Sequence, residues 1–98
     1  IPKDDNLSLE EQINLSSRIS SNIVDYLGVI LLESEKKDEF IEFSHRYNSN
    51  INLMNFNMKN GDTEKAFKKQ EQNLTASIKY YNYIKENYIN ADKEIEER

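Results

Sequence analysis

The only histidine of the chain, His45, follows Glu42 at a Glu-x-x-His spacing, which places two potential metal ligands on one face of a helix. A di-iron bundle needs two such motifs aimed at its core, and this chain carries one. At 100° per residue, both side chains point well away from the seam of Phe40 and Tyr47, which we expect to face the core. The pattern therefore predicts a solvent-exposed histidine, and we expect no metal site and no cofactor.

The other groups that could act in catalysis lack suitable neighbours. The acidic residues stand in runs with lysine or arginine, as on a solvated helix face, where nothing would shift a carboxyl pKa toward general acid–base work. Serines are abundant, but a serine nucleophile needs a general base, and the one histidine is expected to be exposed. Gly28 and Gly61 are too few for a phosphate-binding loop, and Gly28 instead suits a close approach between helices. We therefore predict no catalytic residue and no enzymatic activity.

Length and composition restrict the chain to a small set of folds. It has 98 residues, enough for a single domain over 1–98 with one core. The absence of cysteine excludes disulfide scaffolds, and one proline and two glycines are too few for a β-sandwich. Charged residues make up 32% of the chain, but the two signs nearly balance and apolar residues recur periodically, which favours a folded domain.

Charge and hydropathy also limit the partners. The formal charge is -5 and no basic face is visible, so we expect no nucleic-acid partner. The longest apolar run, 29–32, is too short to span a bilayer, so we expect no membrane insertion of this segment. The abundance of Asn, Ile, Lys, Glu and Tyr is typical of AT-rich genomes and suggests a bacterial source. The absence of cysteine and the start at Ile1 slightly favour an extracytoplasmic or secreted location.

The first helix is predicted at about 8–33, after a lead-in over 1–7. Ser8 and Glu11 form the S-x-x-E pattern of a capping box, which marks a helix N-terminus. Apolar residues then recur along one broad stripe that ends in the apolar segment 29–32, which we expect to be the most deeply buried part of the protein. The stripe comprises Leu9, Ile13, Ile19, Ile23, Val24, Leu27, Ile30 and Leu31.

The second and third helices, at about 36–59 and 63–95, meet at a clear turn. Gly61 suits the left-handed position after a helix C-terminus, and Asp62 suits the N-cap of the next helix. The third helix has a strict seven-residue repeat, which predicts a left-handed supercoil around a partner helix. The seam of the second helix is Phe40, Phe43, Tyr47, Ile51, Met54 and Met58, and the repeat of the third is Phe67, Leu74, Tyr81, Tyr88 and Ile95.

The segment 33–38 contains neither glycine nor proline, and two architectures follow from how it is interpreted. A continuous helix would put the second seam about 140° out of register with the first stripe, whereas a break near Ser34 lets both face one core. The favoured fold is therefore all-α, a small antiparallel three-helix bundle. The alternative is a long helical hairpin that dimerises into a four-helix bundle. In the three-helix bundle we expect deep burial of Leu27, Phe43, Ile51, Leu74, Ile78 and Tyr81.

Some apolar residues fall outside the predicted seams and are candidates for a binding surface. Leu53 and Phe56 lie roughly opposite the seam of the second helix, and Tyr80 and Tyr83 form a smaller stripe opposite Leu74 on the third. Because tyrosine is enriched at interfaces, we predict a protein-binding or self-association surface at these two pairs. The alternative is that they are isolated exposures or cover for the N-terminal segment.

These features favour a non-enzymatic helical bundle that acts through protein–protein interaction, as a secreted or envelope-anchored module. The alternative is an intracellular acidic inhibitor of the immunity type, which binds and neutralises one effector. A homo-oligomeric structural role comes third. In each case the expected partner is another protein or a second copy of the chain.

Overall fold

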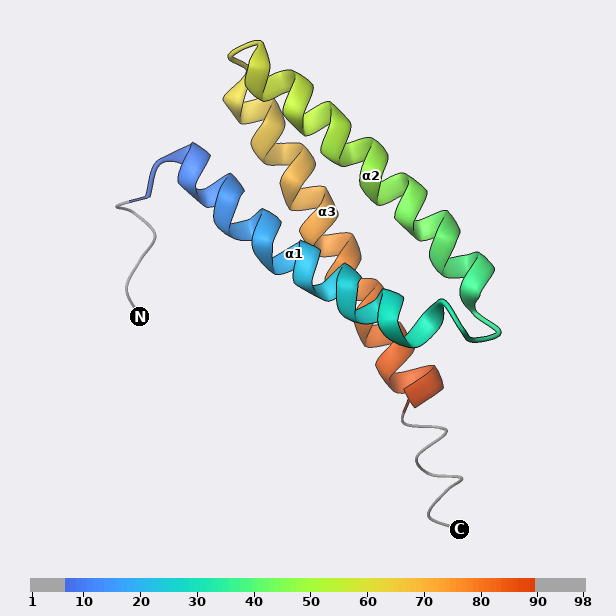
Figure 1. The fold of residues 1–98 in the computed structure, drawn as a ribbon. Coiled ribbons are helices and arrows are strands. Elements are labelled where there is room, and N and C mark those ends of the chain that lie inside the picture. The colour runs from blue at the N-terminus through green and yellow to red at the C-terminus, as the bar shows by residue number, and fades with distance from the viewer. Residues whose placement is uncertain (1–6, 90–98) are drawn as a thin grey trace.

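The computed structural model describes residues 7–89, which form three packed α-helices and, within that range, no strand (Figure 1). The helices are α1 (Leu9–Leu31), α2 (Lys37–Lys59) and α3 (Thr63–Ile84), and a short π-helical turn, η2 (Lys85–Ile89), continues α3. The predicted all-α three-helix bundle is confirmed. The predicted continuation of the third helix over 90–95, with Ile95 of the repeat, lies outside the described residues.

Ser34 organises the turn over 32–36 that separates α1 from α2. Its hydroxyl donates to the Leu31 carbonyl at 2.7 Å and accepts the Lys36 amide at 3.1 Å. The Ser34 carbonyl in turn accepts the amide of Lys37, the first residue of α2. The chain therefore breaks at the predicted residue, although the N-cap of α2 is Lys36. The long continuous helix of the alternative architecture is not formed.

Two end structures predicted from the sequence are present. The Glu11 amide donates to Ser8 Oγ at 3.1 Å and the Ser8 amide donates to Glu11 Oε1 at 2.9 Å, which completes the capping box. The bond from the Ser8 backbone contributes most to lowering the pKa of the Glu11 carboxyl. Gly61 has a φ of 81°, and the Asp62 amide donates to the Asn57 carbonyl at 2.8 Å, as in a Schellman motif.

α3 is the central helix of the molecule. α1 and α2 each pack along it and touch one another much less (Figure 1). α1 and α3 run in the same direction and α2 runs against them. The described residues consequently form a flat body of 54 × 34 × 15 Å.

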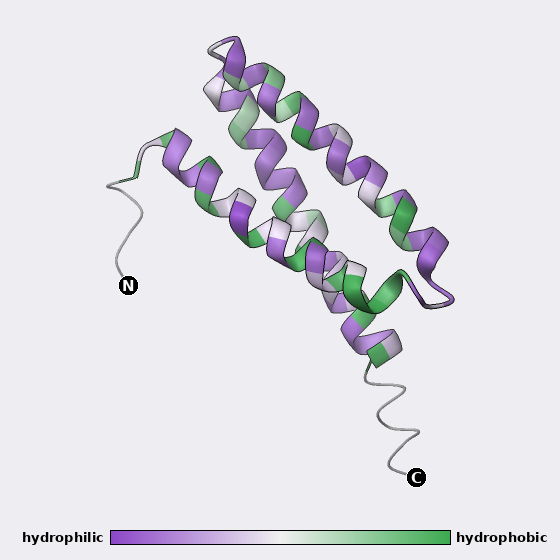
Figure 2. Ribbon diagram, viewed as in Figure 1, coloured by the Kyte–Doolittle hydropathy of each residue, from purple (hydrophilic) through white to green (hydrophobic). Residues whose placement is uncertain are grey.

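Two apolar clusters lie at opposite ends of the molecule. The larger one forms where the apolar C-terminal half of α1, green in Figure 2, meets the start of α2 and the end of α3. The smaller one joins α1, the end of α2 and the start of α3. The buried residues are Leu27, Leu31, Phe40, Phe43 and Ile84 in the larger cluster and Ile13, Met54 and Ala66 in the smaller one.

The prediction of which residues of the third helix are buried is wrong, because a different face of that helix enters the interior. Leu27 and Phe43 are buried as expected, but Ile78 is 42% exposed, and the other expected core residues, Ile51, Leu74 and Tyr81, are only partly buried. The interior instead receives a face of small and polar residues, which lets α1 and α2 both approach α3 closely. That face of α3 is Ala66, Gln70, Asn73, Ser77 and Ile84.

The segment 29–32 is also less buried than predicted. Val29 is 80% exposed and Leu32 is exposed, whereas Leu31 is buried. Val29 lies about 160° around the helix from both Leu27 and Leu31, so it points away from the larger cluster. Because α1 has neighbours on one side only, an apolar segment in α1 leaves some of its residues in water.

Candidate protein-binding surface

The middle of the interface between the three helices is polar. Gln70, which is fully buried, donates through Nε2 to Ser20 Oγ at 3.1 Å and accepts a hydrogen bond from Ser17 Oγ at 3.1 Å. Ser20 Oγ is hydrogen-bonded to the Tyr47 hydroxyl at 3.2 Å, and Asn73 Nδ2 donates to the Tyr47 carbonyl at 3.2 Å. Within residues 7–89, every buried side-chain nitrogen and oxygen has a hydrogen-bond partner. The network therefore fills the interior without leaving a buried polar side chain unpaired.

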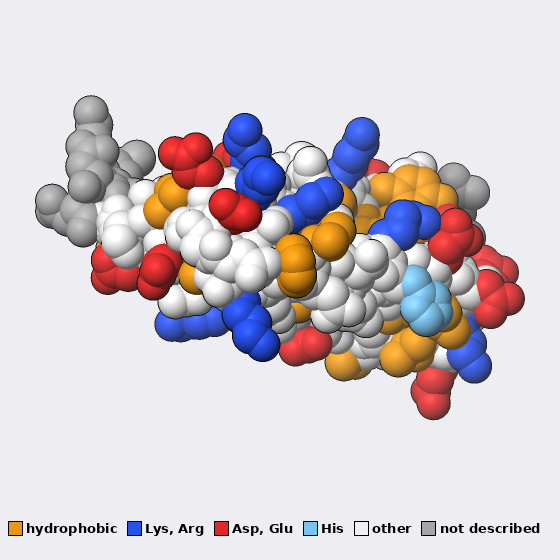
Figure 3. Space-filling view, turned by 90° about the horizontal axis from the view of Figure 1, so that it is seen from above, with side chains coloured by type: hydrophobic (Ala, Val, Ile, Leu, Met, Phe, Trp, Pro, Cys, Tyr) orange, Lys and Arg blue, Asp and Glu red, His pale blue; other side chains and the backbone are white. Residues whose placement is uncertain are grey.

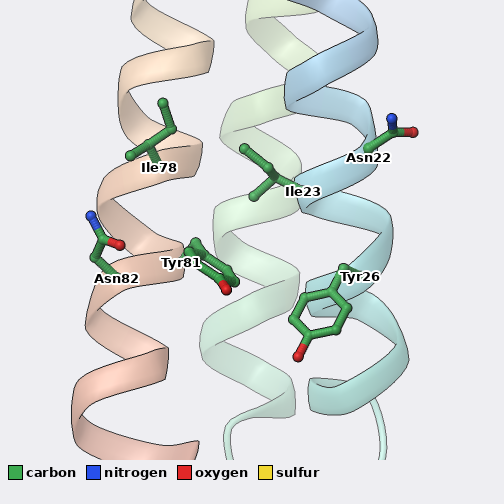
Figure 4. Close-up of a pocket in the computed structure, with 6 residues that line it drawn as sticks. All are labelled: Asn22, Ile23, Tyr26, Ile78, Tyr81 and Asn82. Atoms are coloured by element: carbon green, nitrogen blue, oxygen red, sulfur yellow. The ribbon is translucent and has the colours of Figure 1, made fainter.

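Several other large apolar side chains of α1 and α3 lie outside the interior and line an open groove between the two helices. In the part of the groove shown in Figure 4, Ile23 and Ile78 point toward one another from opposite walls. The rings of Tyr26 and Tyr81 lie below them, with centroids 6.0 Å apart. The cleft has a volume of about 510 Å³, and its lining residues are Asn22, Ile23, Tyr26, Ile78, Tyr81 and Asn82.

The groove continues along both helices toward their N-termini. There it is lined on α1 by Leu15 and Ile19 and on α3 by Phe67 and Leu74, with Glu71 at its edge. We call the whole feature the α1–α3 groove. Its apolar residues are Leu15, Ile19, Ile23 and Tyr26 on α1 and Phe67, Leu74, Ile78 and Tyr81 on α3.

Four side chains of the groove, Leu15, Ile19, Tyr26 and Ile78, are between 42% and 47% exposed. These fractions leave roughly 300–400 Å² of apolar side chain in water, which is comparable to the largest patch on an ordinary monomer. The part of the groove in Figure 4 contains no charged side chain, and an asparagine stands at each outer edge. An apolar centre with uncharged polar edges is the usual composition of a protein-binding surface.

The predicted pair on α2 is exposed, as its position opposite the seam required. Leu53 is 43% exposed and Phe56 is 62% exposed, near the C-terminal end of the helix. The pair is isolated among polar neighbours, and no cavity with a described lining includes either residue. It remains a candidate contact surface, smaller than the α1–α3 groove.

Tyr80 and Tyr83 both line a second open cleft, between α2 and α3, of about 550 Å³; Tyr83 is 41% exposed, whereas Tyr80 is partly buried. The Tyr80 ring stacks on Phe43 at 4.6 Å between centroids, and its hydroxyl donates to Glu39 Oε2 at 2.9 Å. Burial, followed by the contact with Glu39, raises the pKa of Tyr80. α2 packs on the side of α3 that carries Tyr80. This tyrosine therefore belongs to the α2–α3 interface.

Tyr83 is more exposed but is also engaged by α2. Lys36 Nζ donates to its hydroxyl at 3.3 Å and lies 5.3 Å from the ring centroid. The hydrogen bond raises the pKa of Lys36. The two tyrosines thus meet the first turns of α2, whereas Leu53 follows Glu39 by 14 residues, about 20 Å along the helix. The four predicted residues do not form one surface.

The groups considered for metal binding lie at the surface. Glu42 and His45 are both exposed, and Glu42 pairs with Arg46 at 3.1 Å within α2. The histidine is visible at the surface in Figure 3. Across residues 7–89, no three histidine, cysteine or acidic side chains cluster as metal ligands would. No helix in that range combines the length and the apolar content needed to cross a membrane.

Comparison of the chain with protein-family models, with curated proteins and with solved structures found no match. The groove must therefore be interpreted from its own chemistry. The sequence places six of the eight apolar residues of the groove on core-facing stripes, all except Leu15 and Tyr26, although one signal against this is present. Ile13 and Ile19 lie about 120° apart around α1, too far for one neighbouring helix to cover both.

Proposed function

We propose that the protein is a non-enzymatic binding module that recognises another protein chain through the α1–α3 groove. The observation that carries this proposal is the placement of four large apolar side chains in water while a glutamine, an asparagine and serines occupy the interior. Stability alone favours the reverse arrangement, because burying a large apolar side chain stabilises a domain by about 1.5–3 kcal/mol. A partner that covers the groove would recover the part of that free energy that corresponds to the exposed fractions, 42–47% of each side chain.

The shape of the groove favours a helical partner. It lies between two helices that run in the same direction, and its apolar residues recur at helical spacing along both walls. An amphipathic helix laid in such a groove places apolar side chains at every third or fourth residue against the walls. The isoleucines and tyrosines would form the contact centre, and Asn22 and Asn82 would border it.

The alternative function, an acidic inhibitor that neutralises one effector, has less support. Positively and negatively charged side chains are interspersed over most of the face shown in Figure 3, and acidic side chains gather only at one end of it. An inhibitor that acted through acidic charge would need a concentrated field on its contact face. The uncharged centre of the α1–α3 groove also argues against recognition through charge at that site.

The test compares two double variants as baits for partner proteins from cells that express the chain. Ile19→Gln/Ile78→Gln places polar, helix-compatible side chains in the groove, and Leu53→Ser/Phe56→Ser is the matched control on α2. We expect wild type and the α2 variant to retain the same partner and the groove variant to lose it, with all three equally helical by circular dichroism. If the groove variant retains every protein that wild type retains, the groove is not the binding surface.

A further inference from the structure

One face of α3 carries an acidic and a basic residue at equal distances on either side of Ile78. Glu71 precedes Ile78 by seven residues and Lys85 follows it by seven, so all three lie on the same side of the helix, with the charges about 10 Å from Ile78. Lys85 still has right-handed helical geometry as the C-cap of α3. Both charged residues are exposed, and neither forms an ion pair with another residue in the described range.

This arrangement is self-complementary. We propose that the occupant of the α1–α3 groove is a second copy of the chain, packed face to face and antiparallel about a two-fold axis that passes near Ile78. The axis places Glu71 of each copy opposite Lys85 of the other, which gives two equivalent ion pairs. The inference rests on the proposed function of the groove and names its partner, which would cover the groove with its own α1–α3 face in place of a single helix.

The same axis brings apolar side chains of α1 together. In the groove, Ile78 lies opposite Ile23, so the axis meets α1 near Ile23. Tyr26 follows Ile23 by three residues and Ile19 precedes Ile23 by four. Antiparallel packing therefore places Tyr26 of one copy over Ile19 of the other, which covers two of the four half-exposed side chains in each chain.

The dimensions of the molecule are sufficient for such a dimer. A stable interface uses about 800 Å² from each partner, and the broad dimensions of the flat body are 54 × 34 Å. α1 and α2 each pack on α3 and scarcely on one another, so the three helices approach a single layer, whereas most domains consist of at least two packed layers. A second copy on this face would supply the missing layer.

Electrostatics are compatible with pairing although each chain has a formal charge of -5. The uncharged centre of the groove means that no ionised group is buried without a partner there. Salt screens the repulsion between the net charges of the two chains. The two ion pairs at the ends would fix the antiparallel orientation.

The test is sedimentation equilibrium of four variants from micromolar to millimolar concentration. We expect wild type to reach twice the chain mass of 11.6 kDa. Glu71→Lys and Lys85→Glu should each weaken dimerisation by roughly tenfold, because each replaces two attractive pairs with two repulsive ones. The double variant Glu71→Lys/Lys85→Glu should restore the wild-type dissociation constant. Asp25→Lys, an exposed change about 120° around α1 from Ile19, is the control and should not weaken dimerisation.

Two results would overturn the inference. If wild type stays a monomer at every concentration, a second copy is not the occupant of the groove. The proposed function would still stand if wild type retained another protein and the variant Ile19→Gln/Ile78→Gln lost it. If the single charge changes weaken a dimer that the double variant does not restore, Glu71 and Lys85 do not face one another. Loss of both self-association and groove-dependent capture would remove the proposed function as well.

Discussion

At the scale of single residues, the buried polar network is the feature that distinguishes this interior from an ordinary apolar core. Gln70 links Ser17 and Ser20 of α1, and Ser20 reaches the Tyr47 hydroxyl of α2, so one chain of hydrogen bonds connects all three helices. Buried polar groups are costly when a partner is removed, because the remaining group loses water without gaining a replacement. The network therefore makes the positions of α1 and α2 on α3 depend on a few short side chains.

We expect Gln70→Leu to destabilise the protein by about 1–3 kcal/mol, although it makes the interior more apolar. The change leaves the Ser17 and Ser20 hydroxyls without their glutamine partner. The control is Gln72→Leu at an exposed position of the same helix, which should change the free energy of unfolding by no more than about 0.5 kcal/mol. Urea unfolding of both variants measures the difference, and a more stable Gln70→Leu protein would show that the network is not needed.

Gly28 is buried in α1, but a side chain larger than hydrogen fits there. The nearest atoms to an added Cβ belong to the Phe40 ring, at 3.5 and 3.6 Å, which is ordinary van der Waals contact. Gly28→Ala should therefore raise the free energy of unfolding by up to about 1 kcal/mol, the difference in helix propensity. A lower thermal midpoint would instead mean that Phe40 cannot accommodate the methyl group.

At the scale of elements, α1 and α3 each carry two faces with different roles. One face of each enters the interior, and a second apolar face lines the α1–α3 groove. Local signals predicted the helix limits well: the capping box at Ser8, the break at Ser34 and the left-handed Gly61 each depend on a few neighbouring residues. Which face of a helix becomes the interior depends on where the other helices pack. Apolar spacing alone therefore assigned Ile78 to the core and missed Gln70.

The two faces should differ in their effect on stability. Leu27→Ala removes a fully buried side chain from the larger cluster and should destabilise the protein by about 2–5 kcal/mol. Ile78→Ala removes a side chain that is already 42% exposed and should cost only about 1 kcal/mol. Chemical unfolding at low protein concentration makes the comparison on the monomer. Equal losses would place Ile78 in the interior after all.

At the scale of the whole molecule, the central position of α3 accounts for both the flat shape and the exposed groove. Because α1 and α2 contact α3 far more than each other, apolar side chains on the outer side of the α1–α3 pair have no intrachain cover. The exposure of Leu53 and Phe56 could be predicted from the sequence, since it follows from the period of α2 alone. The groove could not, because it combines residues of two helices about 60 positions apart whose packing angle no local pattern specifies.

The pair on α2 should contribute little to the fold. Leu53→Ser/Phe56→Ser should change the melting temperature of the dilute monomer by no more than a few degrees, because both side chains already contact water. The sequence-based prediction that the same change abolishes association is tested in the same samples by light scattering. A large loss of stability would show that the pair packs within the chain, and loss of association at unchanged stability would assign the contact surface to α2.

The most direct test of the central claim, that the α1–α3 groove is the contact surface of the molecule, is a dilution series followed by the backbone amide signals in nuclear magnetic resonance. If the groove is the contact surface, the signals that move on dilution will belong to residues 15–26 of α1 and 71–85 along α3. The amides around Leu53 and Phe56 should stay in place and serve as an internal control. Shifts concentrated around Leu53 and Phe56, with the groove signals unchanged, would contradict the claim.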